Sequence, residues 1–290
     1  MPSTSEVQRI AATALAEDGR SDLTSTLTTA PGLRAEGRLE YRSGGVLAGT
    51  AYAEAVASAC GCFVEWQADE GSTVAPGSVI GILRGDLRAI LRAERPLLNL
   101  LQRASGIATV TRAYVDAVQG TGCRILHTRK TAPGLRALDV AGVVAGGGHR
   151  HRLNLEHEVM VKDNHWQALA RGGTDLGTAL ETARRQGVTA LYVEVESLDQ
   201  LREACTAGAT RLLVDNQSPE SVQRWAEEAK RLSPGIEIEA TGGITLGNVR
   251  AYAEAGADFI SIGALTHSVR AADLALEIGV ARKSAADERA

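Results

Sequence analysis

The sequence predicts an α/β protein built in two different parts, and three features of the 290-residue chain indicate this. Residues 37–91 hold short apolar runs between glycines and charged residues, which is typical of an antiparallel sheet. Over residues 84–118 the apolar residues repeat at helical spacing. From about residue 120 onward, short apolar runs alternate with helical stretches, which implies a parallel sheet with crossover helices.

The first part opens with a predicted amphipathic helix over residues 3–17, because Ser3 and Glu6 stand at capping-box spacing. Residues 18–31 are polar and rich in Thr and Ser, so a loop is expected there. The strands expected in the sheet that follows lie at 45–49, 63–66 and 78–83.

The second part repeats strand and helix too often for anything but a parallel sheet, either open and doubly wound or closed as a barrel. A dinucleotide-binding version has no support, because no G-x-G-x-x-G follows the first strand. The predicted strands are 124–126, 158–161, 190–195, 211–214, 236–240 and 259–262. The predicted helices between the later strands are 176–187, 198–207, 219–232 and 247–256.

Composition narrows the classes of function. A formal net charge of -4 argues against nucleic acid as the main partner. The four cysteines show neither CxxC nor metal-site spacing, so we expect a reduced, cytoplasmic protein. We find no apolar stretch of the roughly 18 residues that a membrane span needs, and the N-terminus does not resemble a signal peptide.

The residues at the predicted strand ends are sorted by charge along the chain. The first two strand ends are cationic, the next two are acidic, and the last two are rich in glycine. Because parallel barrels carry their active sites at the carboxyl ends of the strands, we expect these residues to meet in one pocket. They are His127, Arg129 and Lys130, then Lys162, then Glu196 and Asp215, then Thr241, Gly242 and Gly243, and finally Gly263 and His267.

Each group suits a different chemical partner. The cations, together with His151 and Arg152 after the triple glycine at 146–148, suit an organic anion. Glu196 and Asp215 suit a hard divalent metal or ribose hydroxyls. The glycine-rich ends suit a phosphate group, which backbone N–H groups can bind.

Taken together, these residues resemble the quinolinate phosphoribosyltransferase family, the decarboxylating enzymes of NAD biosynthesis, and the resemblance covers nearly the whole chain. The motifs that carry it are Ala93-Glu94-Arg95, Ser105 to Thr109, Thr128 to Thr131, Pro133 to Arg136, Val161 to His165, Val193 to Glu196, Asp215-Asn216, Thr241 to Gly243 and Gly263 to His267.

The resemblance implies an N-terminal α/β sandwich-like domain plus an incomplete parallel α/β barrel. The implied sandwich domain covers residues 1–108 and 268–290 and is completed by a C-terminal helix, and the barrel covers 109–267. The implied minimal unit is a homodimer in which Arg95 reaches the partner's site.

The same resemblance implies roles for individual residues. An aromatic acid would be held by Arg95, Arg129, Lys130, His151, Arg152 and Lys162. Glu196 and Asp215 would face Mg2+ and the ribose of phosphoribosyl pyrophosphate. Its 5'-phosphate would be lined by Thr241, Gly242, Gly243, Gly263 and His267. The catalytic group would comprise Lys130, Lys162, Glu196 and Asp215.

Four departures from the family lie between residues 127 and 150. The stretch Asp139-Val140-Ala141-Gly142 replaces a pattern that usually carries Lys and Tyr. His127 replaces the usual Asp, His149 an apolar residue and Arg150 the usual Asn. They leave two alternatives open: an acceptor other than quinolinate in a more cationic site, or changes without consequence.

Two rival functions are compatible with the same residues. A barrel enzyme could use Lys130 or Lys162 as a Schiff base. A non-catalytic anion-binding protein could have kept the scaffold, although it would have no use for Glu196 and Asp215.

Overall fold

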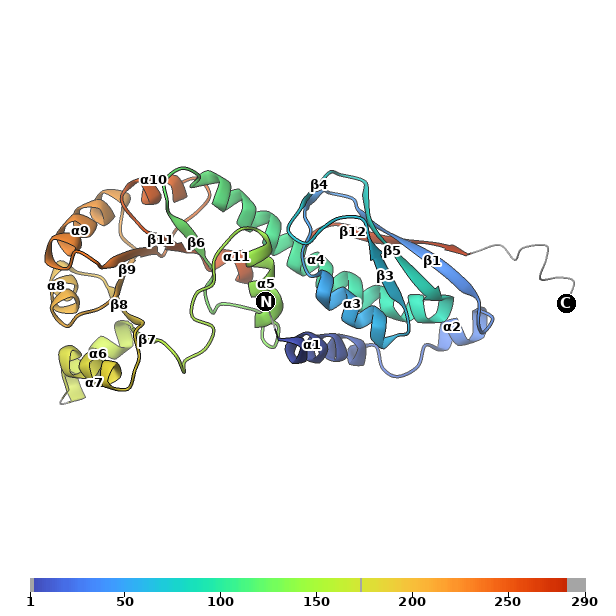
Figure 1. Ribbon diagram of the computed structural model, residues 1–290, viewed down its shortest axis with the longest axis horizontal. Coiled ribbons are helices and arrows are strands. Elements are labelled where there is room, and N and C mark those ends of the chain that lie inside the picture. The colour runs from blue at the N-terminus through green and yellow to red at the C-terminus, as the bar shows by residue number, and fades with distance from the viewer. Residues whose placement is uncertain (1–2, 173, 281–290) are drawn as a thin grey trace, which may run out of the picture. The chain divides into compact units, whose positions relative to one another are not determined.

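The computed structural model describes residues 3–172 and 174–280, which form two compact units (Figure 1). The first, here called the N-terminal unit, comprises residues 3–112, 131–147 and 265–280. The second, here called the barrel unit, comprises residues 113–130 and 148–264, apart from residue 173.

The N-terminal unit contains an antiparallel sheet in the order β12-β1-β5-β3, with a separate small ribbon of β2 and β4. Its strands are β1 (Arg34–Tyr41), β2 (Gly45–Val46), β3 (Phe63–Trp66), β4 (Thr73–Val74), β5 (Ser78–Asp86) and β12 (Leu274–Val280). Its helices are α1 (Thr4–Glu17), α2 (Leu23–Thr28), α3 (Thr50–Ala59) and α5 (Arg136–Ala145), with most of α4 (Leu87–Ala117) and of α11 (Ala264–His267).

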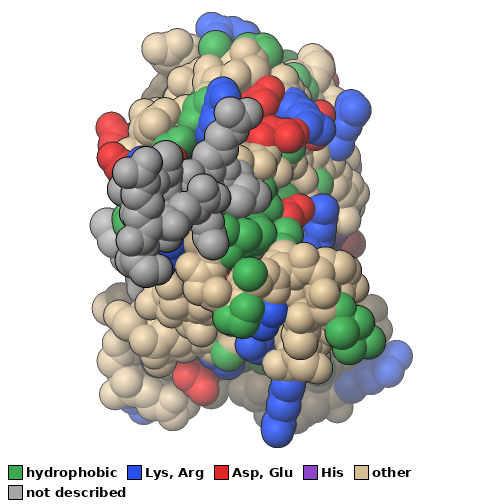
Figure 2. All heavy atoms as spheres, turned by 90° about the vertical axis from the view of Figure 1, so that its right-hand side faces the viewer, with side chains coloured by type: hydrophobic (Ala, Val, Ile, Leu, Met, Phe, Trp, Pro, Cys, Tyr) green, Lys and Arg blue, Asp and Glu red, His purple; other side chains and the backbone are tan. Residues whose placement is uncertain are grey.

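One face of this sheet packs on helices and the other carries charge. Along β1, exposed and buried residues alternate, as the two-residue period of a strand dictates. Leu39 and Tyr41 belong to the same buried cluster as Leu97 of α4. On the charged face, the half-buried Arg84 pairs with the exposed Glu36 of the neighbouring strand. Figure 2 shows acidic and basic side chains next to one another on the surface that it views.

The barrel unit contains a parallel sheet of six strands in the order β6-β11-β10-β9-β8-β7. The strands are β6 (Arg124–Leu126), β7 (Val159–Val161), β8 (Leu191–Val195), β9 (Arg211–Asp215), β10 (Glu237–Thr241) and β11 (Phe259–Ser261). Within the described residues the edge strands β6 and β7 do not pair with each other, so the barrel is incomplete.

Helices connect these strands on the outside of the sheet, as the crossover topology requires. They are α6 (Asp163–Gly172), α7 (Leu176–Arg185), α8 (Leu198–Thr206), α9 (Pro219–Leu232) and α10 (Val249–Glu254). All six strands and four helices predicted from the sequence of this part are confirmed to within two residues at most ends.

Two predictions for the N-terminal unit were wrong. The expected loop 18–31 contains α2, whose first turn is capped by Asp22 accepting from the Ser25 N–H at 3.0 Å. The expected strand at 45–49 ends after Val46, and the Ala-rich segment behind it forms α3. Residues 274–280 enter the sheet as β12 next to β1. The C-terminal helix that the resemblance implies stays a prediction, because residues 281–290 lie outside the described part.

Close approach of segments within the N-terminal unit depends on glycine. A Cβ on Gly106 of α4 would lie 2.3 Å from the carbonyl oxygen of Arg270, so only glycine lets the segment before β12 cross this helix. Among the described residues, no helix is both long and apolar enough to cross a membrane.

Candidate active site

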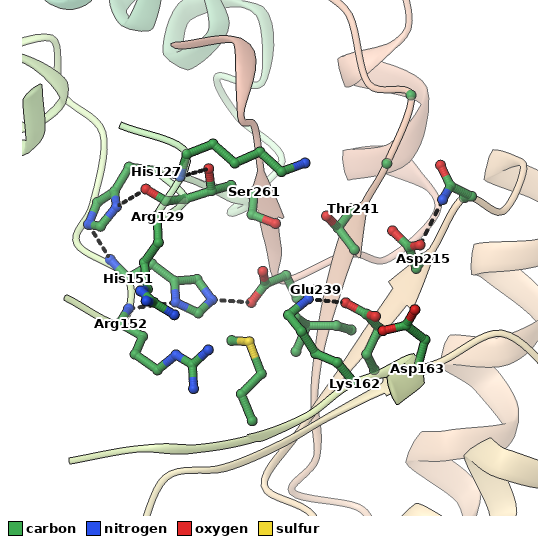
Figure 3. A pocket seen from close by; sticks show the side chains of 18 of the residues that line it. His127, Arg129, His151, Arg152, Lys162, Asp163, Asp215, Glu239, Thr241 and Ser261 are labelled. Carbon is green, nitrogen blue, oxygen red and sulfur yellow. Dashed lines mark hydrogen bonds and ion pairs between the residues drawn. The ribbon is translucent and has the colours of Figure 1, made fainter. Parts of the chain in front are cut away.

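A cavity of about 640 Å³ lies at the carboxyl ends of the six parallel strands, wholly within the barrel unit (Figure 3). All six strands contribute to it, directly or through the residues that follow them. Eleven of the fourteen residues expected in the pocket line it, namely His127, Arg129, Lys130, His151, Arg152, Lys162, Glu196, Asp215, Thr241, Gly242 and Gly243. The tertiary structure thus brings the cationic, acidic and glycine-rich strand ends together, as expected from their order along the chain.

One side of the cavity gathers cations, and Glu158 compensates the charge of Arg152 only in part. Burial, and then the neighbouring positive charge of Arg129, lower the pKa of Arg152. Among the described residues, the buried Nε of Arg152 has no hydrogen-bond partner. The two guanidinium groups repel each other, so the charge on this side of the cavity would suit an anion.

A buried hydrogen-bonded chain stands behind these arginines. His151 Nε2 lies 3.1 Å from Oε2 of Glu239, whose side chain is fully buried. Arg211 Nη1 donates to the same oxygen at 3.2 Å. Burial raises the pKa of Glu239, but the hydrogen bond from His151 and the charge of Arg211 outweigh it, so the net direction is downward.

The opposite side of the cavity is acidic (Figure 3). Lys162 follows β7 and its Nζ forms an ion pair with Glu194 of β8. Burial raises the pKa of Asp215, the negative charges of Glu194 and Glu196 raise it further, and Lys162 opposes them. The carboxylates therefore carry more negative charge than Lys162 neutralises, which fits a cation.

The residues after β10 form the third side. Gly242 and Gly243 both have left-handed backbone conformations, with φ of 82° and 62°. A Cβ on Gly242 would lie 2.2 Å from Oδ1 of Asn216, which follows β9. Only glycine therefore fits this turn, and its backbone lies open to the cavity beside Thr241.

Three predicted site residues are not among those that line the cavity. Arg95 lies on α4 in the N-terminal unit with its side chain 59% exposed. Gly263 follows β11, and His267 ends α11 with Nδ1 2.6 Å from the Ser268 hydroxyl. Their roles stay predictions.

Several lining residues were not predicted from the sequence, chiefly Glu239 and Ser261. Glu239 stands between Ile238 and Ala240 in a strand that is otherwise apolar at its centre. A carboxylate inside a strand of a buried parallel sheet was the available signal, because a buried charge needs a partner.

The three single-residue departures from the family pattern occupy different environments. His127 lines the cavity and is fully buried, whereas His149 and Arg150 are exposed and outside its lining. Both ring nitrogens of His127 face backbone groups, Nδ1 the Thr128 carbonyl and Nε2 the His151 N–H. A carbonyl only accepts and an N–H only donates, so the ring is neutral and adds no cationic charge to the site.

The fold and cavity define an α/β-barrel protein with a charged cavity at its strand ends. Two family models match the chain: the quinolinate phosphoribosyl transferase C-terminal domain over residues 107–277, and the N-terminal domain over residues 22–105. The chain therefore belongs to the quinolinate phosphoribosyl transferase family.

Individual relatives agree with this assignment. The nicotinate-nucleotide pyrophosphorylase (carboxylating) of Mycobacterium leprae is 37% identical over 275 residues, which are 91% of this chain and 94% of that protein. A probable enzyme of the same name from Bacillus subtilis is 41% identical over 217 residues, 74% of this chain and 73% of that protein. The nicotinate-nucleotide pyrophosphorylase structure from Francisella tularensis has a TM-score of 0.88 at 31% identity and covers 96% of this chain and 98% of that one.

Proposed function

We propose that the protein transfers the phosphoribosyl group of phosphoribosyl pyrophosphate to the ring nitrogen of quinolinate, with decarboxylation, and releases nicotinate mononucleotide, CO2 and pyrophosphate. The observation that carries this proposal is the arrangement of one cavity with a cationic and an acidic side. Two anionic substrates of different chemistry can then meet at one point, which is the main demand of a group transfer.

On the cationic side, Arg129, Arg152 and Lys130 would bind the two carboxylates of the aromatic acid. The unpartnered Nε of Arg152 supports this, because a guanidinium can bind a carboxylate through two parallel hydrogen bonds. His151 has both ring nitrogens bonded to protein atoms, so it would support Arg152 rather than contact the acid.

On the acidic side, Glu196 and Asp215 would hold the ribose hydroxyls and Mg2+, and the turn at Gly242 and Gly243 would receive the 5'-phosphate. Within the described residues there is no group of three or more potential protein ligands for a metal. This fits Mg2+, which commonly binds one or two carboxylates and takes its other ligands from substrate phosphates and water. When bound, Mg2+ would offset the charge of the leaving pyrophosphate.

The reaction needs no nucleophilic side chain. The ring nitrogen of the acid forms a bond to C1 of the ribose as the bond from C1 to the pyrophosphate oxygen breaks. The ribosylated ring is cationic and accepts the electron pair released when the adjacent carboxylate leaves as CO2, and a proton then takes its place. The protein positions the two anions, and its carboxylates stabilise the positive charge that develops on the ribose.

The two rival functions receive less support. Lys162 is committed to an ion pair with Glu194, which suits an ammonium group rather than the neutral amine of a Schiff-base lysine. A simple anion binder would gain nothing from Glu194, Glu196 and Asp215 beside its ligand.

A homodimer, with Arg95 lent to the partner's site, is part of the same proposal, and the exposed side chain of Arg95 supports it. A cytoplasmic location is proposed as well, supported by four free cysteines in the described part of the chain.

The test is incubation of the purified protein with quinolinate labelled in the 2-carboxyl group, phosphoribosyl pyrophosphate and MgCl2. We expect nicotinate mononucleotide and labelled CO2 in equal amounts, and no product with the Asp215→Asn variant. Release of pyrophosphate only with some other aromatic carboxylate would replace the acceptor and leave the transferase class intact. No transfer to any such acid would refute the proposal.

A further inference from the structure

His127, at the end of β6, occupies a position that fixes where its proton lies. Its side chain is fully buried, and Nδ1 lies 3.0 Å from the carbonyl oxygen of Thr128. Nε2 lies 3.0 Å from the backbone nitrogen of His151. The proton must therefore sit on Nδ1, and the lone pair of Nε2 must accept from the His151 N–H.

The chain of hydrogen bonds continues from His151 into the core of the barrel unit. Nδ1 of His151 accepts from the backbone N–H of Arg152 at 2.6 Å, so its proton lies on Nε2 and is donated to Glu239. Arg211 donates a hydrogen bond to Glu239, and the guanidinium of Arg211 lies 3.8 Å from the ring centre of Phe259. The far end of the chain is thereby fixed by packing as well as by charge.

His127 is the other end of this chain. Its Nε2 accepts a hydrogen bond from the backbone N–H of His151. The ring of His151 donates to Glu239 and accepts from the backbone N–H of Arg152 (Figure 3). Arg152 in turn lines the cavity with an unpartnered Nε. Neither histidine keeps a ring nitrogen for a substrate, so their contribution to acid binding is indirect.

We propose that His127 is a positioning residue that sets the affinity for the aromatic acid by holding the His151–Arg152 segment as a neutral hydrogen-bond acceptor, not as a cation. The proposal rests on the proposed function, because it assumes that Arg152 binds the acid. It identifies a role for the one unusual residue of the 127–150 region that lines the cavity.

Two substitutions of His127 separate this role from the alternatives. The side-chain oxygen of Gln reaches the place of Nε2, whereas that of Asn reaches only the place of Nδ1. We expect His127→Gln to keep the KM for quinolinate within about threefold and His127→Asn to raise it roughly tenfold, the scale for loss of one hydrogen bond to a buried donor. The KM for phosphoribosyl pyrophosphate should change little in either variant.

Other outcomes would overturn the proposal. A direct cationic contact predicts equal losses in both variants, because neither carries charge. A merely structural role predicts similar changes in the KM values of both substrates, following the loss of thermal stability. If wild-type protein turns over quinolinate and the two variants have the same KM, the inference fails and the proposed function stands. If the wild type does not turn it over, both fail.

A second measurement reads the protonation state of His127 directly in the wild-type protein. In 15N NMR of histidine side chains, the ring of His127 should show a protonated Nδ1 and an unprotonated Nε2 near neutral pH. The signal is assigned by its loss in His127→Gln. A doubly protonated ring, or one protonated on Nε2, would refute the proposal.

Discussion

Replacement of Arg152 by alanine tests the cationic side of the cavity most directly. Removing one member of a buried, hydrogen-bonded charge pair costs about 2–5 kcal/mol. Arg152 is only partly buried, and its Nε has no protein partner that alanine would orphan, so we expect the lower part of this range. A loss of about 2–3 kcal/mol of binding free energy corresponds to a roughly 30- to 150-fold larger dissociation constant for quinolinate.

The assay is calorimetric titration of quinolinate into wild type, Arg152→Ala and Arg150→Ala. Arg150 is a matched control, because it carries the same charge two residues away but is exposed and outside the cavity lining. It should leave affinity unchanged. Arg152→Ala should not lower the melting temperature, since it removes the repulsion from Arg129. Equal affinity of wild type and Arg152→Ala would refute the assignment of the cationic side.

Three further predictions concern the other parts of the site. Asp215→Asn should abolish transfer but raise the melting temperature at pH 7, because the raised pKa of Asp215 means that its ionisation disfavours the folded state. The gain in melting temperature should vanish as the pH falls to 3.8, where the carboxyl group is protonated in the folded protein. A lower melting temperature at pH 7 would contradict this. Gly242→Ala should raise the KM for phosphoribosyl pyrophosphate more than Gly243→Ala. Both substitutions cost about 1–2 kcal/mol of backbone strain, but only the Cβ at position 242 would clash with Asn216. Equal effects in steady-state kinetics would show that this clash does not matter. Mixing inactive Arg95→Ala with inactive Asp215→Asn should restore roughly a quarter of wild-type activity if Arg95 acts in the partner's site. Random assortment makes half of the dimers mixed, and one of the two sites in each mixed dimer is intact. No recovery of activity would show that Arg95 is not shared between subunits.

The sequence by itself determined the parallel sheet and the content of its site. Strand ends of a parallel barrel meet at one edge, so the local order of charges was enough to predict nine of the residues that line the cavity. The N-terminal unit was less predictable. Short Ala- and Thr-rich segments such as α2 and α3 depend on caps and packing as much as on periodicity, and β12 forms only because β1 offers a partner about 240 residues away.

Only the tertiary structure decided what each side chain does in the cavity. His127 looked like an added cation, but its burial between the Thr128 carbonyl and the His151 N–H makes it neutral. Lys162 pairs with Glu194, and Glu239 joins the site from the interior of a strand. Protonation states and partners depend on burial and on distances between residues far apart in the chain, which a one-dimensional pattern does not contain.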